Sequence, residues 1–371
     1  MKRVAIIMAG GVGERFWPIS RHSYPKQLLK IGNQRTMLDA AVERIQSIVS
    51  TDDIFIVTGR SLKAAIEAEI KTLPAGNVIA EPEGKNTAAC LALACALVEQ
   101  RYTGEDVVMI VLTADHFIRD VDAFRKDCEA AAQFAGQNAA LVTFGIRPTR
   151  PETGYGYIEV GAPASDSAPI FKVSSFREKP DAGTAERFLE DGGFLWNSGM
   201  FVWRNSTLRD AFASHLPATH SRLDALARAF GHGQPLRELD EAFQPLEKIS
   251  IDVGVMERAT NVVVLRASFD WDDIGTWTSL PRLLGQDAAG NVVFGKGALL
   301  KSEDSIIYTV DCGGNESASA PAHPRLVVGY NLKGIVVVST PDAVFVLPAE
   351  DVQRVKDVVS YLREQGLEEY L

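Results

Sequence analysis

The stretch Val4-Ala5-Ile6-Ile7-Met8-Ala9-Gly10-Gly11-Val12-Gly13-Glu14-Arg15 stands near the start of the chain and joins an apolar run to a glycine-rich turn. Such a run is typical of a buried strand in a parallel sheet. Glycines directly after a strand let backbone N–H groups approach a phosphate, and Arg15 and Lys26 add positive charge for phosphate oxygens. The stretch therefore predicts an α/β fold whose first turn holds a nucleoside triphosphate.

Two common phosphate-binding motifs are excluded by the residues that follow this turn. A Walker A loop ends in Gly-Lys-Ser/Thr, which does not occur here, and Phe16 occupies the position of the third glycine in a dinucleotide fingerprint. A Gly-x-Gly alone is more often a tight turn. The added Arg15, Pro18 and Pro25-Lys26 make the pattern similar to the signature of sugar nucleotidyltransferases, which join a sugar 1-phosphate to a nucleoside triphosphate.

Composition indicates a globular protein that does not bind nucleic acid. The chain has 371 residues, 46% of them hydrophobic and 23% charged, and its net charge of -10 is not interrupted by a basic stripe. The N-terminus leads straight into a core strand and no apolar run approaches about 18 residues, so we expect no signal peptide, no membrane segment and a cytoplasmic location. The cysteines form no Cys-x-x-Cys pair and are expected to be buried, reduced thiols. They are Cys90, Cys95, Cys128 and Cys312.

The first half of the chain alternates apolar runs with helical patterns. Alternation of this kind predicts βαβ units in a doubly wound, mostly parallel sheet, with ligands at the carboxyl ends of the strands. The expected strands are Val4–Met8, Ile54–Thr58, Val107–Leu112 and Ala140–Phe144, and the expected helices are Met37–Val49, Leu62–Lys71, Thr87–Gln100 and Ala123–Phe134.

From about residue 150 strands and helices mix, and near Gly285–Gly290 the pattern changes to short apolar runs separated by turn residues. We expect a nucleotidyltransferase-like catalytic domain over residues 1–285 and a small β domain over residues 286–371, closed by a helix at Ala349–Arg363. Open strand edges need covering, so this tail is expected to serve stability or assembly into a homodimer. The runs are Asn291–Phe294, Ala298–Leu300, Ser305–Val310, Leu326–Val328, Ile335–Ser339 and Ala343–Leu347.

Acidic residues in two distant segments are candidates for a shared Mg²⁺ site. Asp115 follows the run Val107–Leu112, at the expected carboxyl tip of a central strand. The second segment, Phe269–Trp277, carries Asp270, Asp272 and Asp273. Two acids can hold one Mg²⁺ whose other ligands are water and phosphate oxygens, as nucleotidyl transfer requires. A strand-end aspartate can instead cap a helix, and the residues alone leave the choice within the second segment open.

The segment Glu81-Pro82-Glu83-Gly84-Lys85-Asn86-Thr87 opens an expected helix and is a candidate for binding the base. Asn86 and Thr87 sit where a helix N-cap belongs, and a helix N-terminus also favours anions. The Glu81 carboxylate can accept from N1–H and N2–H₂ of guanine together, whereas adenine presents an acceptor at N1. A solvated surface role for Glu81 is the alternative.

Three further segments are candidates for the sugar phosphate. Gly154–Ile158 lets backbone approach a ligand, Phe176–Pro180 carries Glu178 beside Lys179, and Asn197–Phe201 offers an amide next to Gly199. Lys179 could bind the phosphate, and Glu178 and Asn197 could bind sugar hydroxyls. Each segment alone is also compatible with an ordinary turn, a solvated loop or a strand entry.

Together these motifs resemble the mannose-1-phosphate guanylyltransferases, over essentially the whole chain. The resemblance implies the nucleotide-diphospho-sugar transferase fold with a C-terminal domain similar to a short left-handed β-helix. It also implies GTP and mannose 1-phosphate as substrates, GDP-mannose and pyrophosphate as products, and Mg²⁺ as cofactor. Longer relatives carry a fused cupin-type phosphomannose isomerase domain, which this length does not accommodate, so a monofunctional enzyme is expected. Gly254 is a further departure, because it interrupts an apparent helix.

The resemblance also assigns roles to individual positions. It implies catalysis by Arg15, Lys26, Asp115 and Lys179, and a metal held by Asp115 and Asp273. The implied nucleotide-binding residues are Ala9, Gly10, Gly11, Gly13, Glu81, Pro82, Gly84, Asn86 and Thr87. The implied sugar-phosphate-binding residues are Gly156, Glu178, Lys179, Asn197 and Gly199. Three alternatives remain open, namely another sugar such as a heptose 1-phosphate, a catalytically silent subunit that senses GDP-sugar, and an NAD-dependent oxidoreductase, which Phe16 weakens.

Overall fold

The computed structural model describes residues 1–11, 13–31, 35–233, 236–310 and 325–371. The chain divides into two compact units. The larger unit comprises Met1–Gly10, Ala41–Ala114 and Ile118–Trp271, and the smaller one Gly11–Ala40, Asp115–Phe117 and Asp272–Leu371. The glycine-rich turn from Gly11 onward therefore belongs to the same compact unit as the C-terminal strands. The division into compact units does not follow the predicted domain boundary at residue 285. As a division of function, that boundary stays a prediction.

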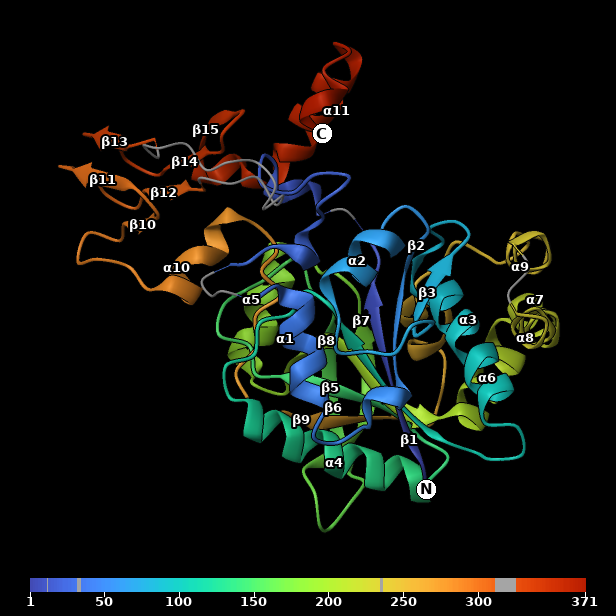
Figure 1. The fold of residues 1–371 in the computed structure, drawn as a ribbon. Coiled ribbons are helices and arrows are strands. Elements are labelled where there is room, and N and C mark those ends of the chain that lie inside the picture. Colours follow the sequence, from blue (N-terminus) through green and yellow to red (C-terminus); the bar gives the residue numbers. More distant parts are fainter. Residues whose placement is uncertain (12, 32–34, 234–235, 311–324) are drawn as a thin grey trace. The chain divides into compact units, whose positions relative to one another are not determined.

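The larger unit is built on a nine-stranded sheet in the order β3-β2-β1-β4-β8-β5-β9-β7-β6 (Figure 1). The first apolar run forms β1 in the interior of this sheet, where Val4 to Ile7 are completely buried between β2 and β4. The strands are β1 (Arg3–Ala9), β2 (Ile54–Gly59), β3 (Val78–Glu81), β4 (Val108–Thr113), β5 (Leu141–Ile146), β6 (Tyr157–Pro163), β7 (Ile170–Arg177), β8 (Phe194–Arg204) and β9 (Val262–Arg266).

The sheet is mixed: seven of its nine strands run in one direction, as the expectation of a mostly parallel sheet requires, and β8 and β7 run in the opposite direction. Strands β3, β2, β1 and β4 run parallel, but β8 lies antiparallel between β4 and β5, and β7 is antiparallel to β6 and β9. The reversal of β8 is not visible in the sequence pattern, because β8 is largely buried like its neighbours β4 and β5. An apolar run records burial and not strand direction.

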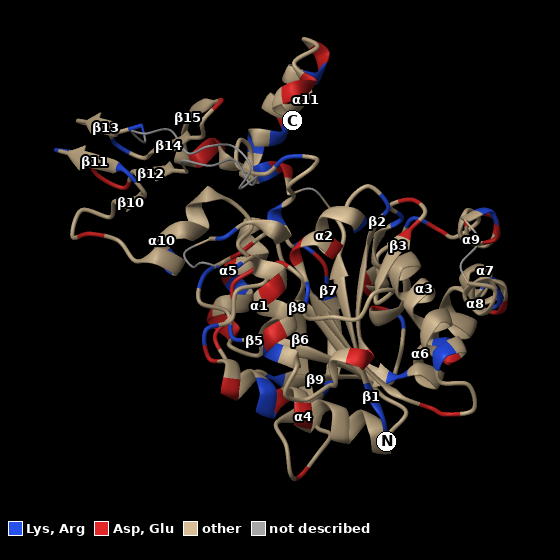
Figure 2. Ribbon diagram, viewed as in Figure 1, with Lys and Arg blue, Asp and Glu red and all other residues tan. Residues whose placement is uncertain are grey.

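Helices cover this sheet, and charged residues lie mostly on the helices and loops (Figure 2). Helix α3 is apolar on all sides because Ala88 to Val98 are buried, a composition that fits a helix enclosed by protein. The helices are α1 (Met37–Ile45), α2 (Lys63–Glu69), α3 (Asn86–Arg101), α4 (Val121–Gln137), α5 (Ala182–Asp191), α6 (Asn205–His215), α7 (Pro217–His220), α8 (Leu223–Gly231) and α9 (Leu236–Phe243).

The cysteines of the described residues are free, buried thiols, as expected, and burial raises the pKa of Cys90, Cys95 and Cys128. Cys312 lies outside the described residues. Among the helices that the structure describes, none combines the length and apolar character needed to span a membrane.

The smaller unit contains all six predicted C-terminal strands. Strands β10, β12 and β14 form one parallel ladder that β15 extends antiparallel, and β11 and β13 form a second parallel ladder. Their bounds are β10 (Val292–Phe294), β11 (Gly297–Leu300), β12 (Ile306–Thr309), β13 (Val327–Tyr330), β14 (Ile335–Ser339) and β15 (Val344–Pro348), preceded by α10 (Leu280–Leu284).

The predicted final helix is a 3₁₀ turn, Ala349–Arg354, followed by α11 (Val355–Glu364). Val355 and Val359 of α11 are buried in one apolar cluster with Phe16 and Trp17, which directly follow the glycine-rich turn. The two ends of the sequence therefore share a core in this unit.

Candidate active site

A pocket of about 470 Å³ lies in the smaller unit, at the glycine-rich turn. Cations, acids and glycines that the sequence places far apart converge on it. The lining residues are Gly11, Gly13, Glu14, Arg15, Phe16, Lys26, Asp115, His116, Asp273, Gly275 and Lys356. Both phosphate-binding cations and both metal carboxylates implied by the family resemblance are among them.

Gly13 is required by the approach of Lys26. Its backbone has φ +71°, and a Cβ at this position would lie 2.3 Å from the Cβ of Lys26, so any larger residue would push the lysine away. The buried Lys26 Nζ donates to Asp115 Oδ2 and to the Asp273 carbonyl oxygen, each at 2.7 Å. Lys26 thus ties together the turn and both acidic segments.

The electrostatics of the pocket favour an ionised Asp115 and leave Arg15 available for a ligand. Desolvation opposes ionisation of Asp115, but Lys26 and His116 outweigh it, and the pKa of Asp115 lies below its ordinary value. The Arg15 Nε is buried and has no hydrogen-bond partner among the described residues. An unsatisfied buried donor next to a pocket is expected to meet a ligand acceptor.

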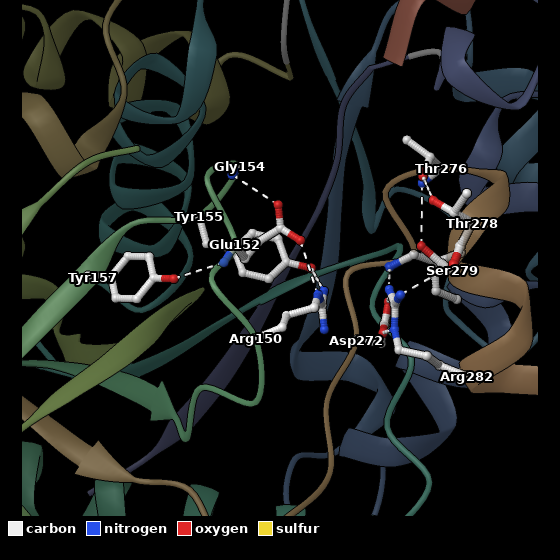
Figure 3. A network of polar contacts seen from close by, with 11 residues as sticks. Arg150, Glu152, Gly154, Tyr155, Tyr157, Asp272, Thr276, Thr278, Ser279 and Arg282 are labelled. Atoms are coloured by element: carbon white, nitrogen blue, oxygen red, sulfur yellow. Dashed lines mark hydrogen bonds and ion pairs between the residues drawn. The ribbon is translucent and has the colours of Figure 1, made fainter. Parts of the chain in front are cut away.

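The structure distinguishes the three acids that the sequence left in competition. Asp270 Oδ1 accepts from the backbone N–H groups of Arg119 and Asp120, each at 2.8 Å. In Figure 3, Asp272 is paired with Arg282, and its Oδ1 also accepts from the Ile274 backbone at 2.8 Å. Both carboxylates therefore serve the fold.

Asp273 is the member of this segment that lines the pocket. Gly275 leaves room for its carboxylate, because a Cβ there would lie 3.0 Å from Asp273 Oδ2. The structure describes no cluster of three or more His, Cys, Asp or Glu suited to a metal ion. A candidate metal position thus has two carboxylates, Asp115 and Asp273, whose oxygens suit Mg²⁺ if water and phosphate complete the shell.

In the larger unit, Glu81 ends β3 with a buried carboxylate. Burial raises the pKa of Glu81 to about 7, although a hydrogen bond with Cys90 lowers it in part. Its Oε1 has no partner among the described residues, and its Oε2 lies 3.9 Å from where a Cβ on Gly10 would stand. A solvated surface role for Glu81 is thus wrong, since only 6% of the residue is exposed.

The residues after Glu81 form a tight entry into α3. Asn86 adopts φ +68°, and its Oδ1 accepts from the Thr87 N–H at 2.8 Å, while Thr87 Oγ1 accepts from the Ile251 N–H at 2.8 Å. The expected N-cap role is therefore wrong, because Lys85 precedes the helix without a side-chain cap bond and Thr87 instead anchors a distant segment. Pro82 and Gly84 lie in the loop between β3 and α3.

Three of the sugar candidates come together in the larger unit. A Cβ on Gly156 would lie 2.7 Å from Glu178 Oε2 and 3.5 Å from the Asn197 Cβ, so this glycine makes room for both side chains. Gly199 has φ +69° and donates its N–H to Asn197 Oδ1 at 3.3 Å. Lys179 Nζ is 3.2 Å from Glu178 Oε1, on a largely exposed side chain.

Asp252 is a residue of this cluster that the sequence analysis missed. Asn197 Nδ2 donates to its Oδ1 at 2.8 Å, and Thr143 Oγ1 donates to Asn197 Oδ1 at 3.0 Å, so both ends of the amide are fixed. Burial and then the charge of Glu178 raise the pKa of Asp252 to about 6. The segment Ser250–Glu257 resembles a family segment in sequence, but that resemblance gave Asp252 no role.

Gly254 now has a packing explanation. It lies in a π-helical turn, Asp252–Met256, and a Cβ there would lie 2.9 Å from Leu216 Cδ1. The glycine therefore allows this turn to pack closely against Leu216.

The loop before Gly156 is braced by the polar contacts on one side of Figure 3. Arg150 donates to Glu152 Oε2 and to the Tyr155 hydroxyl, each at 3.2 Å, and the Tyr157 hydroxyl accepts from the Glu152 backbone at 3.0 Å. Tyr155 also packs edge-on against Trp196 with ring centroids 5.2 Å apart. These contacts brace the Gly154–Ile158 segment beside Asn197.

Comparisons with known proteins identify the family of this chain. The nucleotidyl transferase family model matches residues 4–289. The chain is 36% identical over 379 residues to a mannose-1-phosphate guanylyltransferase of Escherichia coli K12, covering 100% of this chain and 75% of the relative. It is 35% identical over 369 residues to one of Klebsiella pneumoniae, covering 98% and 75%.

A solved structure is similar over the whole length. It is described as a mannose-1-phosphate geranyltransferase from Thermus thermophilus, with a TM-score of 0.84, 33% identity, and coverage of 98% of this chain and all of that one. The family model, the mixed sheet and this structural likeness define a nucleotidyltransferase of the nucleotide-diphospho-sugar transferase fold. Within that class, the chain belongs to the mannose-1-phosphate guanylyltransferase family.

Proposed function

We propose that this chain transfers the guanylyl group of GTP to mannose 1-phosphate, giving GDP-mannose and pyrophosphate. The observation that carries the proposal is the pocket in which Arg15, Lys26, Asp115 and Asp273 surround the glycine-rich turn. Full-length similarity to mannose-1-phosphate guanylyltransferases supports the identity of the two substrates.

The reaction needs no nucleophile from the protein. A phosphate oxygen of mannose 1-phosphate attacks the α-phosphorus of GTP in line, the bond from that phosphorus to the β-phosphate oxygen breaks, and pyrophosphate leaves. Arg15 and Lys26 hold phosphate oxygens, while the backbone at Gly11 and Gly13 lies close to them. Asp115 and Asp273 would hold Mg²⁺, which when bound neutralises charge on the phosphates.

The base and the sugar would be bound by residues of the larger unit. Glu81 supplies two acceptors for guanine N1–H and N2–H₂, and its unsatisfied Oε1 supports that role. The Glu178 carboxylate accepts hydrogen bonds from sugar hydroxyls, and the Asn197 amide donates to them. Asp252 fixes the orientation of Asn197. Lys179, exposed beside Glu178, binds the sugar phosphate. Ala9, Gly10, Pro82, Gly84, Asn86 and Thr87 complete the proposed nucleotide-binding set, and Gly156 and Gly199 complete the sugar set.

The direct test is release of pyrophosphate across a matrix of nucleoside triphosphates and sugar 1-phosphates. We expect the GTP and mannose 1-phosphate pair to give the highest kcat/KM. A higher kcat/KM with a heptose 1-phosphate would mean that this sugar, and not mannose 1-phosphate, is the substrate. Binding of GDP-mannose without any turnover would favour the sensing subunit.

Replacing Lys26 or Lys179 by alanine should change the KM for different substrates. Lys26→Ala should raise the KM for GTP or lower kcat, since Lys26 lines the phosphate pocket. Lys179→Ala should mainly raise the KM for mannose 1-phosphate, by about tenfold for one lost charge-assisted contact. Both constants measured for both variants test the assignment, and exchanged effects would reverse it.

We also propose a cytoplasmic homodimer whose contact lies on the C-terminal strands. Exposed apolar side chains on β13 and β15 support this, namely Val328, Tyr330, Val344 and Val346. The parallel ladders of the same region support a short left-handed β-helix. Sedimentation equilibrium tests the dimer, and a monomeric mass at micromolar concentration would contradict it.

A further inference from the structure

Lys356, on the C-terminal helix α11, lines the phosphate pocket beside the glycine-rich turn. Its side chain is exposed and makes no hydrogen bond or ion pair in the described part of the chain. The nearby Arg354, in contrast, forms ion pairs with Asp357 at 3.3 Å and with Asp351 at 3.7 Å. Lys356 is thus a cation held at the pocket without an acid to neutralise it.

Helix α11 holds this lysine in place because it is anchored on the turn itself. Val355 and Val359 are buried with Phe16 and Trp17, on either side of Lys356 in sequence. The Trp17 Nε1 donates to the Tyr370 carbonyl oxygen at 2.7 Å, and Arg363 lies 3.9 Å from Glu14. A backbone fixed in this way lowers the entropic cost of a contact between Lys356 and a ligand.

The lining of the pocket carries acids as well as cations, because Glu14 lies there together with Asp115 and Asp273. Lys26 is already paired with Asp115 at 2.7 Å, and the candidate metal carboxylates add negative charge. Arg15 and Lys356 are therefore the lining cations that the described contacts leave without an acid. Polyphosphate oxygens need such charges, and Lys serves them as a point charge.

We propose that Lys356 binds the terminal phosphates of the nucleoside triphosphate and, after transfer, the pyrophosphate that leaves. The proposal rests on the proposed function for the identity of that triphosphate. The glycine-rich turn and Arg15 line the same pocket as Lys356. The C-terminal region therefore contributes to chemistry, which differs from the expectation that it serves only stability or assembly.

The test replaces Lys356 with methionine and measures the Kd of pyrophosphate with Mg²⁺ by calorimetry, together with the KM for each substrate. We expect the pyrophosphate Kd and the GTP KM to rise about tenfold, the effect of losing one charge-assisted contact. The KM for mannose 1-phosphate should change by less than about twofold, and Lys356→Arg should restore most of the affinity.

Arg354→Met is the matched control, because it removes one positive charge from the segment next to α11 but not from the pocket lining. Equal pyrophosphate Kd values for Lys356→Met and the control would overturn the proposal, as would a rise confined to the KM for mannose 1-phosphate. If the unmodified chain makes no GDP-mannose yet loses pyrophosphate affinity on Lys356→Met, the proposed function fails and the role of Lys356 stands.

Discussion

Asp115→Asn and Asp273→Asn are each expected to lower the rate of GDP-mannose formation by roughly 10²- to 10³-fold while the chain stays folded. Each substitution removes an anionic oxygen from the lining of the pocket at the glycine-rich turn. Mg²⁺ is hard and tolerates few substitutes for carboxylate, so its apparent affinity should fall together with the rate. The measurements are kcat at saturating substrates, the Mg²⁺ concentration that gives half of it, and Mn²⁺ binding by electron paramagnetic resonance.

Asp270→Asn is the control, because Asp270 stands in the same segment and instead accepts from the Arg119 and Asp120 backbone. It should change thermal stability and leave the dependence on Mg²⁺ unaltered. Asp115→Asn also removes the acid partner of Lys26. Asp273→Asn leaves that ion pair intact, so the two variants separate loss of a metal ligand from displacement of Lys26. Near-normal turnover with unchanged Mg²⁺ dependence in either variant would exclude that residue from the metal position.

The sequence could indicate that an acid after Phe269 matters, but it could not say which one. Asp270, Asp272 and Asp273 differ by single positions, and the family resemblance alone favoured Asp273. The distinction comes from partners at a distance, since Asp272 is paired with Arg282 and Asp273 is directed to the pocket lining. Pairing of this kind depends on the folded chain and leaves no spacing signal.

The sequence pattern could predict neither the direction of β8 nor the place of Lys356 in the lining of the pocket. The six C-terminal strands were predicted from apolar runs between turn residues, but the reversal of β8 was not, because burial on both faces gives the same pattern in either direction. Lys356 stands in an amphipathic helix where an exposed lysine is ordinary. Its proximity to Arg15 follows from the core shared by Val355 and Phe16.

The buried Glu81 carboxylate is expected to destabilise the folded chain when it is ionised. Replacing Glu81 by glutamine should therefore change both the free energy of unfolding and the preference for guanine. The Glu81 pKa of about 7 in the folded chain exceeds the ordinary 4.5 because of burial. Ionisation therefore destabilises the folded state progressively as pH rises from about 4.5 to 7, and fully above that. Glu81→Gln should raise the free energy of unfolding at pH 8 by up to about 3 kcal/mol and leave it unchanged near pH 4.5.

The same substitution should remove the preference for guanine. An ionised Glu81 presents two acceptors to guanine N1–H and N2–H₂, whereas glutamine replaces one acceptor with a donor. We expect kcat/KM for GTP to fall by about 10²- to 10³-fold while the value for ATP changes little, because a buried site built for two donors rejects a ligand that lacks them. In the unmodified chain, kcat/KM for GTP should also decline as pH falls below about 7, since protonation removes an acceptor, and this decline should be absent in Glu81→Gln.

Glu83→Gln is the matched control, because Glu83 lies in the same loop but is largely exposed and 3.7 Å from Lys85. It should alter neither the ratio of GTP to ATP use nor the pH dependence. A structural role for Glu81 would produce the gain in stability at pH 8 with an unchanged nucleotide ratio. That result would indicate that backbone groups around Pro82 and Gly84, and not Glu81, recognise the base. Stability gained together with guanine preference lost would mean that the buried carboxylate is retained for the ligand and not for the fold.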